Sequence, residues 1–582
     1  MRWYLAALLT MSVLTLGCGA EAPDSQVAGD RAAANQAAAD AKLAQPDTES
    51  RYIASEPMPD AAAPVPEMPA EPSATPPPPS EAALPMLGPV ESESLAEPPD
   101  DVAAVQPGEF NTESYDRIYE NPFLLTRQRP LSTFSVDVDT ASYSNVRRIL
   151  RQGRLPPRGA VRIEELVNYF DYDYPTPDGD VPFSVSVEVA ACPWNTGHRL
   201  ARIGLKGMVL SQEERPAANL VFLLDVSGSM NQPNKLPLLK SAMKMLVQNL
   251  SQRDRVAIAV YAGAAGLVLP STSCENKDVI IAALDQLQAG GSTAGGAGIQ
   301  LAYGVAEQNL IPEHVNRVIL CTDGDFNVGM TDQSELIRLI EDKAKSGVFL
   351  TVLGFGMGNY KDSRLEKLAD KGNGNYGYVD TILEAQKMLV DQLAGTLVTI
   401  AKDVKIQIDF NPAQVGAYRL IGYENRLLKD EDFKDDTKDA GEIGAGHTVT
   451  ALYELVPAGD EGDLPKIDPS KYQQPKELSP DAESDELLTV RLRYKQPDAA
   501  TSQELLYPVT DSGKAVEEAS PDFQFAAAVA CYGMLLRESE HRGEGTFDLA
   551  LQLANRGKGE DPSGYRGEFI QLVKLAQTLS GG

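Results

Sequence analysis

Apolar and polar positions follow two different periods along this chain. Between residues 219 and 380, near-continuous apolar runs such as NLVFLLD, RVAIAVYA, RVILCTD and VFLTVLGFG alternate with helical patterns such as KLPLLKSAMKMLVQNL. Apolar strands that alternate with amphipathic helices are typical of a parallel sheet covered by helices on both faces. The pattern therefore predicts a doubly wound, Rossmann-like α/β domain over residues 215–397.

Strands with a period of two lie on both sides of that domain. FSVSVEVA and HRLARIGLKG precede it within residues 183–210, and DVKIQIDF, AYRLIGYEN, HTVTALYELVP, ELLTVRLRYKQ and ELLYPVT follow it within residues 398–512. This alternation indicates half-buried strands. We expect both groups to form one antiparallel β-sandwich, with the α/β domain inserted between them.

Two shorter segments complete the folded part of the chain. Residues 108–182 combine an apolar run with two helical patterns, which predicts a small α+β domain, and residues 518–582 show three apolar patterns at helical spacing. A chain of 582 residues exceeds what one hydrophobic core holds, which is about 250–300 residues. The expected fold class is therefore multi-domain α/β plus β, with a helical segment at the C-terminus.

The first 107 residues have a different character. Arg2 and a short apolar run precede Thr15-Leu16-Gly17-Cys18, which resembles a bacterial lipobox. We therefore expect residues 1–18 to be a lipoprotein signal peptide and Cys18 to carry a lipid anchor, with an ordinary cleaved signal peptide as the alternative. Residues 19–107 are rich in Ala, Pro and Glu, so we expect a disordered linker. The predicted location is the cell envelope, at the outer membrane or a periplasm-facing membrane.

Charge and cysteine usage limit the possible partners. The formal net charge of −31 repels phosphate backbones, so we expect no nucleic acid partner. Cys192, Cys274, Cys321 and Cys531 form no CxxC pair and the chain has four histidines, so no zinc site is expected. Cys321 lies in an apolar strand, where a lone cysteine is typically a small buried side chain. We predict no disulfide.

Polar residues with metal-binding chemistry follow the apolar strands of the α/β domain. NLVFLLD ends in Asp225 and continues to Ser227 and Ser229, the Gly-rich loop GGSTAGGAG carries Thr293, and RVILCTD ends in Asp323. Ligands of doubly wound sheets bind beyond the carboxyl ends of the strands. Carboxylates and hydroxyls suit a hard divalent cation, with Mg²⁺ expected first and Mn²⁺ or Ca²⁺ as alternatives. The simpler alternative is that these side chains only cap turns and helix ends.

The order D-x-S-x-S, then Thr, then Asp resembles the metal-ion-dependent adhesion site of von Willebrand factor type A domains at all five positions. The resemblance implies that Asp225, Ser227, Ser229, Thr293 and Asp323 contact a metal ion directly or through water. LPPRGAVRIEELVNYF, CPWN, TDGDFNVG and GNYKDSRLEKLADKGNGNY are similar to the YfbK-like bacterial family of von Willebrand A proteins over most of residues 110–582. That family implies an N-terminal segment, an A domain and a C-terminal module, and it implies no particular ligand.

Three hypotheses about function remain open at this point. In the first, the A domain binds a partner protein, whose Asp or Glu completes the coordination of the divalent ion. In the second, the protein is an envelope scaffold and the metal only stabilises the domain. In the third, Asp137 and Asp139 act as a DxDxT phosphatase motif, although that fold needs a downstream Lys and acidic pair on a further parallel sheet and the neighbouring segments here are short and lead into the antiparallel region. No Ser-His-Asp or Cys-His set stands out, so we expect no enzyme.

Overall fold

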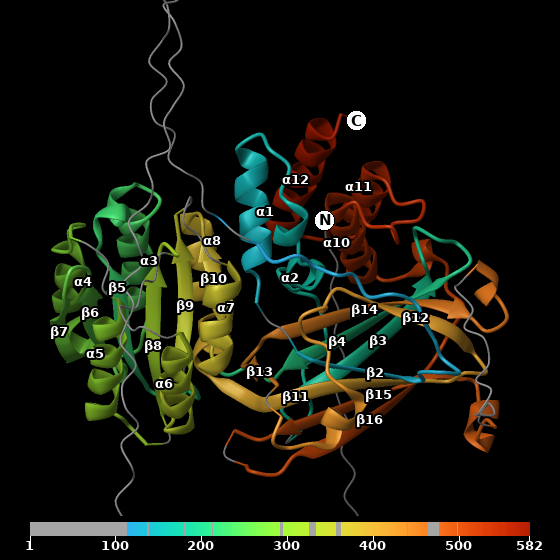
Figure 1. Cartoon of the computed structure of the whole chain (residues 1–582), viewed down its shortest axis with the longest axis horizontal. Helices are drawn as coiled ribbons and strands as arrows, with labels where there is room; N and C mark the ends of the chain where they lie inside the picture. Colours follow the sequence, from blue (N-terminus) through green and yellow to red (C-terminus); the bar gives the residue numbers. More distant parts are fainter. Residues whose placement is uncertain are drawn as a thin grey trace, which may run out of the picture. The chain divides into compact units, whose positions relative to one another are not determined.

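The computed structural model describes most of the chain after residue 112 (Figure 1). The described residues are 113, 115–136, 139–179, 181–211, 213–291, 295–312, 314–324, 333–356, 362–438, 440–463, 477–497 and 499–581. Residues 101–582 belong to one compact unit. The predicted signal peptide with Cys18, the linker, Asp137 and Thr293 lie outside the described residues.

A six-stranded sheet with the order β10-β9-β8-β5-β6-β7 forms the centre of the α/β domain. All neighbouring strands are parallel except β7, which is antiparallel to β6. The strands are β5 (Ala218–Asp225), β6 (Arg255–Tyr261), β7 (Ala265–Ser273), β8 (Val315–Thr322), β9 (Phe349–Phe355) and β10 (Tyr376–Val379). Parallel pairing of the apolar runs confirms the doubly wound fold expected from the sequence.

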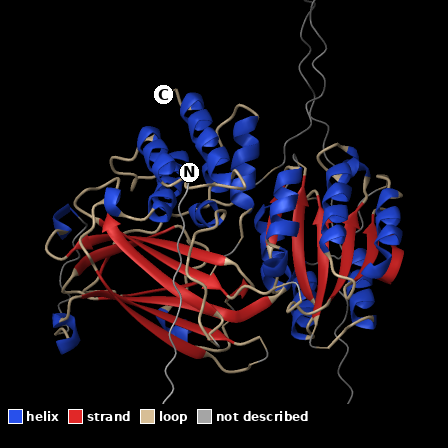
Figure 2. Ribbon diagram, turned by 180° about the vertical axis from the view of Figure 1, so that it is seen from behind, coloured by secondary structure: helices blue, strands red, loops and turns tan. Residues whose placement is uncertain are grey.

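Side chains of the central strand β5 alternate between two cores, which explains its continuous apolar character. Phe222 and Leu224 pack in one core, whereas Val221 and Leu223 pack in the other. Helices cover both faces of this sheet (Figure 2). One core includes side chains of α3 (Leu236–Asn249), α4 (Lys277–Asp285) and α8 (Ile382–Gln386), and the other includes those of α5 (Gly295–Gln308), α6 (Gln333–Lys345) and α7 (Asp362–Lys371).

Two antiparallel sheets form a β-sandwich beside this domain. One has the order β1-β12-β14-β4-β3, and the other has β13-β11-β15-β16 with β2 also paired to β11. Ile203 in β4 and Ile406 in β11 belong to the same core. The strands are β1 (Leu124–Leu125), β2 (Leu131–Ser135), β3 (Phe183–Ala191), β4 (Arg199–Gly207), β11 (Thr399–Phe410), β12 (Val415–Ile421), β13 (Gly441–Gly444), β14 (Thr448–Pro457), β15 (Glu486–Lys495) and β16 (Gln503–Thr510).

The α/β domain is an insertion in the sandwich. Strand β4 precedes the domain and pairs with β14, which follows it, in a register that places Arg202 opposite Leu452. The domain returns to the sandwich through α8, a π-helical turn (Lys387–Asp391) and α9 (Leu393–Leu397), which leads into β11. The chain therefore enters and leaves the α/β domain through strands of the same sandwich.

Residues 113–182 do not form a sheet of their own, which differs from the small α+β domain expected from the sequence. β1 pairs with β12 and β2 pairs with β11. α1 (Ala141–Arg151) and α2 (Ile163–Asn168) share a core with α10 (Pro521–Arg537), α11 (Phe547–Arg556) and α12 (Tyr565–Leu579). Strands this short bury too little apolar surface to be stable alone, so they complete sheets formed by later residues.

The remaining features of the fold concern the cysteines and the membrane. Cys192, Cys274, Cys321 and Cys531 are buried and free, so their thiols pack as apolar groups. Among the residues that the structure describes, no helix is both long and apolar enough to cross a bilayer.

Short 3₁₀ turns also occur in the described residues. They are Arg158–Ala160, Gly228–Asn231, Cys274–Asn276, Asp430–Lys434, Glu461–Asp463, Pro480–Glu483 and Val516–Glu518.

Candidate metal-binding site

The candidate site lies at the carboxyl ends of two adjacent strands. Asp225 is the last residue of β5, and Asp323 directly follows β8. These strands pair in parallel at the centre of the sheet, and β6 continues the chain on the other side of β5. This is the point where the strand order reverses, which is the usual ligand position in doubly wound sheets. The topology therefore brings two carboxylates from residues about a hundred positions apart to one edge.

The turn after β5 brings two hydroxyls close to Asp225. The backbone N–H of Ser227 donates to Asp225 Oδ1 at 2.9 Å. Ser227 has an extended backbone and precedes the 3₁₀ turn Gly228–Asn231. The hydroxyl oxygens of Ser227 and Ser229 then lie 3.0 Å apart. The D-x-S-x-S spacing thus places one carboxylate and two hydroxyls on the same side of a tight turn.

The loop that leads to Thr293 is attached to this turn by two backbone hydrogen bonds. Gly228 N–H donates to the carbonyl of Gly291 at 3.0 Å, and Gly290 N–H donates to the carbonyl of Val226 at 2.7 Å. Gly291 has a φ of +85°, a left-handed conformation that glycine adopts without strain. Thr293 itself lies outside the described residues, two positions after Gly291.

Burial makes the negative charges of this site energetically unfavourable. Asp225 and Asp323 are both fully buried. Burial raises the pKa of the Asp225 carboxyl to about 6, against the hydrogen bonds from Ser227 that lower it, and the nearby charge of Asp323 adds to the rise. Tyr261 donates its hydroxyl to Asp225 Oδ2 at 3.2 Å. Two buried carboxylates at one edge need compensating positive charge.

A lysine in the site was missed by the sequence analysis. Lys235 Nζ lies 3.0 Å from Asp323 Oδ2, and the lysine is only 3% exposed. Lys235 directly precedes α3, where Leu236 begins the apolar stripe. A lysine at the start of an amphipathic helix normally lies in solvent, so its position in the sequence carried no signal that the ammonium is buried.

The donor set suits a hard divalent cation. Its described members are the carboxylates of Asp225 and Asp323 and the hydroxyls of Ser227 and Ser229, and oxygen donors of this kind are what Mg²⁺, Mn²⁺ and Ca²⁺ prefer. The part of the chain that the structure describes has no group of three or more His, Cys, Asp or Glu side chains placed to hold a metal. The described donors of this edge are therefore the oxygen atoms of two carboxylates and two hydroxyls.

Asp139, the second aspartate of the alternative phosphatase motif, forms hydrogen bonds that stabilise the fold. Its Oδ1 accepts a hydrogen bond from the backbone N–H of Tyr376 at 2.9 Å, and its Oδ2 accepts one from Arg426 at 3.3 Å. Both oxygens of Asp139 are therefore engaged in joining β10 to the sandwich. Asp137 lies outside the described residues.

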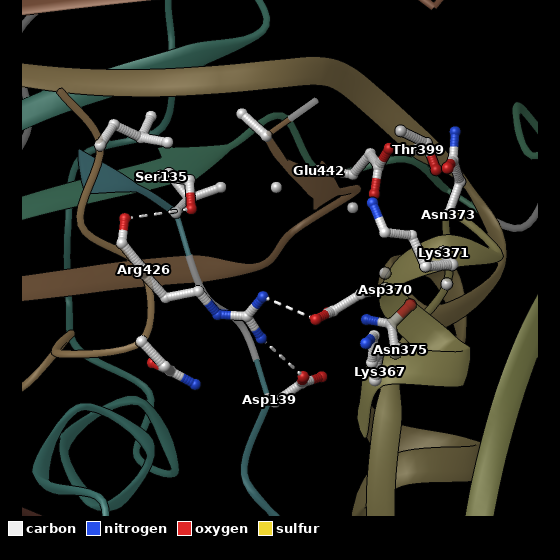
Figure 3. A pocket seen from close by; sticks show the side chains of 18 of the residues that line it. Ser135, Asp139, Lys367, Asp370, Lys371, Asn373, Asn375, Thr399, Arg426 and Glu442 are labelled. Atoms are coloured by element: carbon white, nitrogen blue, oxygen red, sulfur yellow. Dashed lines mark hydrogen bonds and ion pairs between the residues drawn. The ribbon is translucent and has the colours of Figure 1, made fainter. Parts of the chain in front are cut away.

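A polar pocket of about 240 Å³ lies where the α/β domain meets the sandwich and the N-terminal segment (Figure 3). Arg426 extends into it and donates to Asp370 at 2.9 Å and to Asp139 at 3.3 Å. Charged and amide side chains dominate its lining, which includes Ser135, Lys367, Lys371, Asn373, Asn375, Thr399 and Glu442. Asp225, Ser227, Ser229 and Asp323, the candidate metal ligands that the structure describes, are not among the lining residues of this pocket.

Comparisons with known proteins agree with this arrangement of fold and site. Three family models match the chain: "von Willebrand factor" over residues 109–202, "von Willebrand factor type A domain" over 219–392, and "Uncharacterized protein YfbK, C-terminal" over 395–579. The central domain is therefore a von Willebrand factor type A domain, a protein-interaction module that often depends on a bound metal ion.

Individual relatives extend the match over most of the chain. The chain is 44% identical over 476 residues to the uncharacterized protein YfbK of Escherichia coli (strain K12), and the matched region covers 81% of this chain and 82% of that protein. It is 29% identical over 203 residues to the inter-alpha-trypsin inhibitor heavy chain H1 of Sus scrofa, and the matched region covers 32% of this chain and 22% of that protein. The chain belongs to the YfbK-like family of von Willebrand factor type A proteins, as its motifs indicated.

Among solved structures, proximal thread matrix protein 1 from the mussel byssus, described with a zinc-occupied metal-ion-dependent adhesion motif, is 25% identical. That match has a TM-score of 0.25 and covers 33% of this chain and 46% of that chain.

Proposed function

We propose that this protein is a cell-envelope lipoprotein whose A domain binds a partner protein through a divalent metal ion. Asp225, Ser227, Ser229, Thr293 and Asp323 would hold the ion, with Mg²⁺ preferred. The observation that carries the proposal is the convergence of two buried carboxylates and two hydroxyls at the carboxyl edge of β5 and β8. Cys18 would carry the lipid, and residues 19–107 would hold the folded unit away from the membrane.

The partner is expected to contribute an Asp or Glu side chain. A divalent ion bound here would supply an electron-poor centre, because part of its coordination comes from neutral hydroxyls. An incoming carboxylate would balance that charge better than a neutral group. The chain's net charge of −31 disfavours contact with acidic surfaces elsewhere. An acidic partner would therefore bind at the carboxyl edge of β5 and β8, which we call the metal edge.

A scaffold function is the second candidate, and one observation favours it. Arg147 in α1 forms buried ion pairs with Asp380 and Glu384, which lie at the end of the A domain. These ion pairs join the A domain to the N-terminal segment, so the A domain packs against its neighbouring modules. In this alternative, metal binding stabilises the folded unit and no partner is needed.

The metal site is tested by calorimetric titration of Mg²⁺, Mn²⁺ and Ca²⁺ into the purified full chain. We expect binding to the wild type and loss of binding in the Ser227→Ala, Ser229→Ala double variant. Ser241→Ala is the matched control, because its exposed hydroxyl bonds only the Pro237 carbonyl within α3. No binding of any ion by the wild type would exclude a metal-dependent function.

The two candidate functions are then separated by partner capture. Envelope extract is passed over the immobilised chain with Mg²⁺ or with EDTA, and the double variant serves as the negative control. A protein retained only by the wild type with Mg²⁺ supports the binding function. Metal binding without any such protein would support the scaffold.

A further inference from the structure

The buried Lys235 ammonium belongs to the metal edge itself. Its Nζ lies 3.0 Å from Asp323 Oδ2, and both side chains are shielded from solvent, with 4% and 0% of the side chain exposed. Removing an ammonium from water is costly unless its charge is balanced. A lysine that reaches this depth therefore has a specific electrostatic partner, and that partner is one of the candidate metal ligands.

The surrounding backbone leaves a path for the lysine side chain. Gly356, which follows β9, has a φ of +78°, and a Cβ at that position would lie 2.6 Å from Lys235 Cγ and 2.8 Å from Cδ. The Gly356 carbonyl accepts a hydrogen bond from the buried hydroxyl of Tyr378, which fixes its place. At the other end, Lys235 N–H donates to the Gln232 carbonyl at 3.0 Å. Hydrogen bonds thus hold the lysine at its backbone N–H and at its ammonium, and its aliphatic part occupies the space that a Cβ at position 356 would need.

Formal charges show what the lysine changes. Asp225 and Asp323 with Lys235 leave one net negative charge on the protein side of the site. A divalent ion would then make the site positive by one charge, whereas the same site without the lysine would be neutral. Like charges a few ångströms apart repel strongly where water is excluded. Lys235 therefore opposes the ion and at the same time favours an anionic ligand on it.

We propose that Lys235 is a specificity-determining residue of the metal edge: its ammonium shares Asp323 with the divalent ion, weakens binding of the ion, and leaves a positive charge that a carboxylate neutralises. This inference rests on the metal-binding function proposed above, and it adds a reason for the choice of an acidic ligand. Lys235 contacts Asp323 through Oδ2, so the ammonium and an ion bound at this edge would interact with the same carboxylate.

The first test is titration of Mg²⁺ into the full-length wild type and the Lys235→Met variant, which removes the charge and keeps a similar length. We expect the variant to bind Mg²⁺ at least about tenfold more tightly. Lys235→Gln, which keeps a hydrogen-bond donor beside Asp323, should show the same direction of change and provides a second variant if Lys235→Met does not fold. Lys244→Met is the control, since Lys244 lies in α3, the helix that Lys235 precedes, and pairs with Asp285 at the surface.

The second test measures the preference for an anionic ligand with acetate as the probe. Each protein is loaded with Mn²⁺, and water-proton relaxation is followed while acetate is added, because acetate that displaces water from Mn²⁺ lowers the relaxation enhancement. We expect half-displacement at several-fold lower acetate concentration in the wild type than in Lys235→Met.

The outcomes separate this inference from the proposed function. Equal Mg²⁺ affinity in wild type and variants, or equal acetate displacement, would overturn the role of Lys235 and leave the metal site intact. Weaker Mg²⁺ binding in both lysine variants would show that Lys235 only positions Asp323, which also overturns it. Absence of Mg²⁺ binding by every protein would overturn the metal site, and the role of Lys235 with it.

Discussion

Arg147 in α1 donates a hydrogen bond to Glu384 in α8 at 2.7 Å, and both side chains are buried. The same guanidinium also pairs with Asp380 after β10 and, at 3.0 Å, with Glu568 in α12. One side chain therefore connects the N-terminal segment, the A domain and the last helix. The A domain belongs to one compact unit with its flanking modules.

Replacing Arg147 should destabilise that whole unit. Arg147→Met leaves Glu384 and Asp380 buried without their cation, so we expect the free energy of unfolding to fall by about 3–5 kcal/mol, measured by urea denaturation. Arg151→Met is the control. Arg151 pairs with Glu568 from a half-exposed position and should change stability by less than about 1 kcal/mol. Equal effects of the two substitutions would contradict the proposed connection.

Asp225→Asn should separate stability from metal binding. In EDTA we expect the variant to be as stable as the wild type, or more stable by on the order of 1–2 kcal/mol, because the buried negative charge beside Asp323 is removed. Addition of Mg²⁺ at about 100-fold above the dissociation constant should stabilise the wild type by about 2.7 kcal/mol and leave the variant unchanged. Thermal unfolding measures both effects, and a large loss of stability of the variant in EDTA would disprove the electrostatic argument.

His447 should make stability depend on pH. Burial lowers the pKa of His447 to about 4, and its Nδ1 is buried without a hydrogen-bond partner among the described residues. Between pH 6.5 and 4 the unfolded chain binds a proton at this histidine and the folded chain does not, so the free energy of unfolding falls as the pH falls through this range. Above pH 6.5 the contribution is constant.

The comparison that isolates His447 uses its neutral replacement. From pH 7 to 4, the wild type should lose up to about 3 kcal/mol more than His447→Gln, measured by urea denaturation at each pH. The exposed His314 provides the control, and His314→Gln should follow the wild-type curve. Parallel curves for wild type and His447→Gln would show that the imidazole is not held neutral by the fold.

Thiol chemistry should report the integrity of the cores. Cys192, Cys274, Cys321 and Cys531 are buried, and burial raises the pKa of Cys274 to about 11 and that of Cys531 to about 12. In a Cys18→Ser variant at pH 8, we expect almost no reaction with a coloured disulfide reagent until denaturant is added, when four thiols per chain react. Rapid labelling of the native protein would indicate that one of these cores opens readily.

The candidate site could be located from sequence because its signals are local. The apolar run at residues 220–224 of β5 is buried on both faces of a parallel sheet, and Asp225 is the charged residue that ends the strand. Asp323 follows β8 in the same way. Both residues must then lie at the carboxyl edge, since parallel strands end on the same side. The spacing of Ser227 and Ser229 is equally local, because one short turn connects them.

The N-terminal segment could not be placed in the same way. Phe134 in β2 pairs with Ile406 in β11, and Leu124 in β1 pairs with Tyr418 in β12. Nothing near these strands in the sequence offers a partner, so the pattern indicated a separate small domain. Which distant strand completes a sheet depends on edges that exist only after the later residues fold.

The sequence by itself determined the doubly wound A domain, the flanking strands, the terminal helices and the positions of Asp225, Ser227, Ser229 and Asp323 in the chain, because period and strand ends are local properties. Only the tertiary structure decided that Lys235 reaches Asp323, that Asp139 joins β10 to the sandwich, and that Arg147 fastens three modules together. A charged residue in a sequence normally indicates solvent. Whether it is instead buried depends on an opposite charge that folding brings from a distant part of the chain.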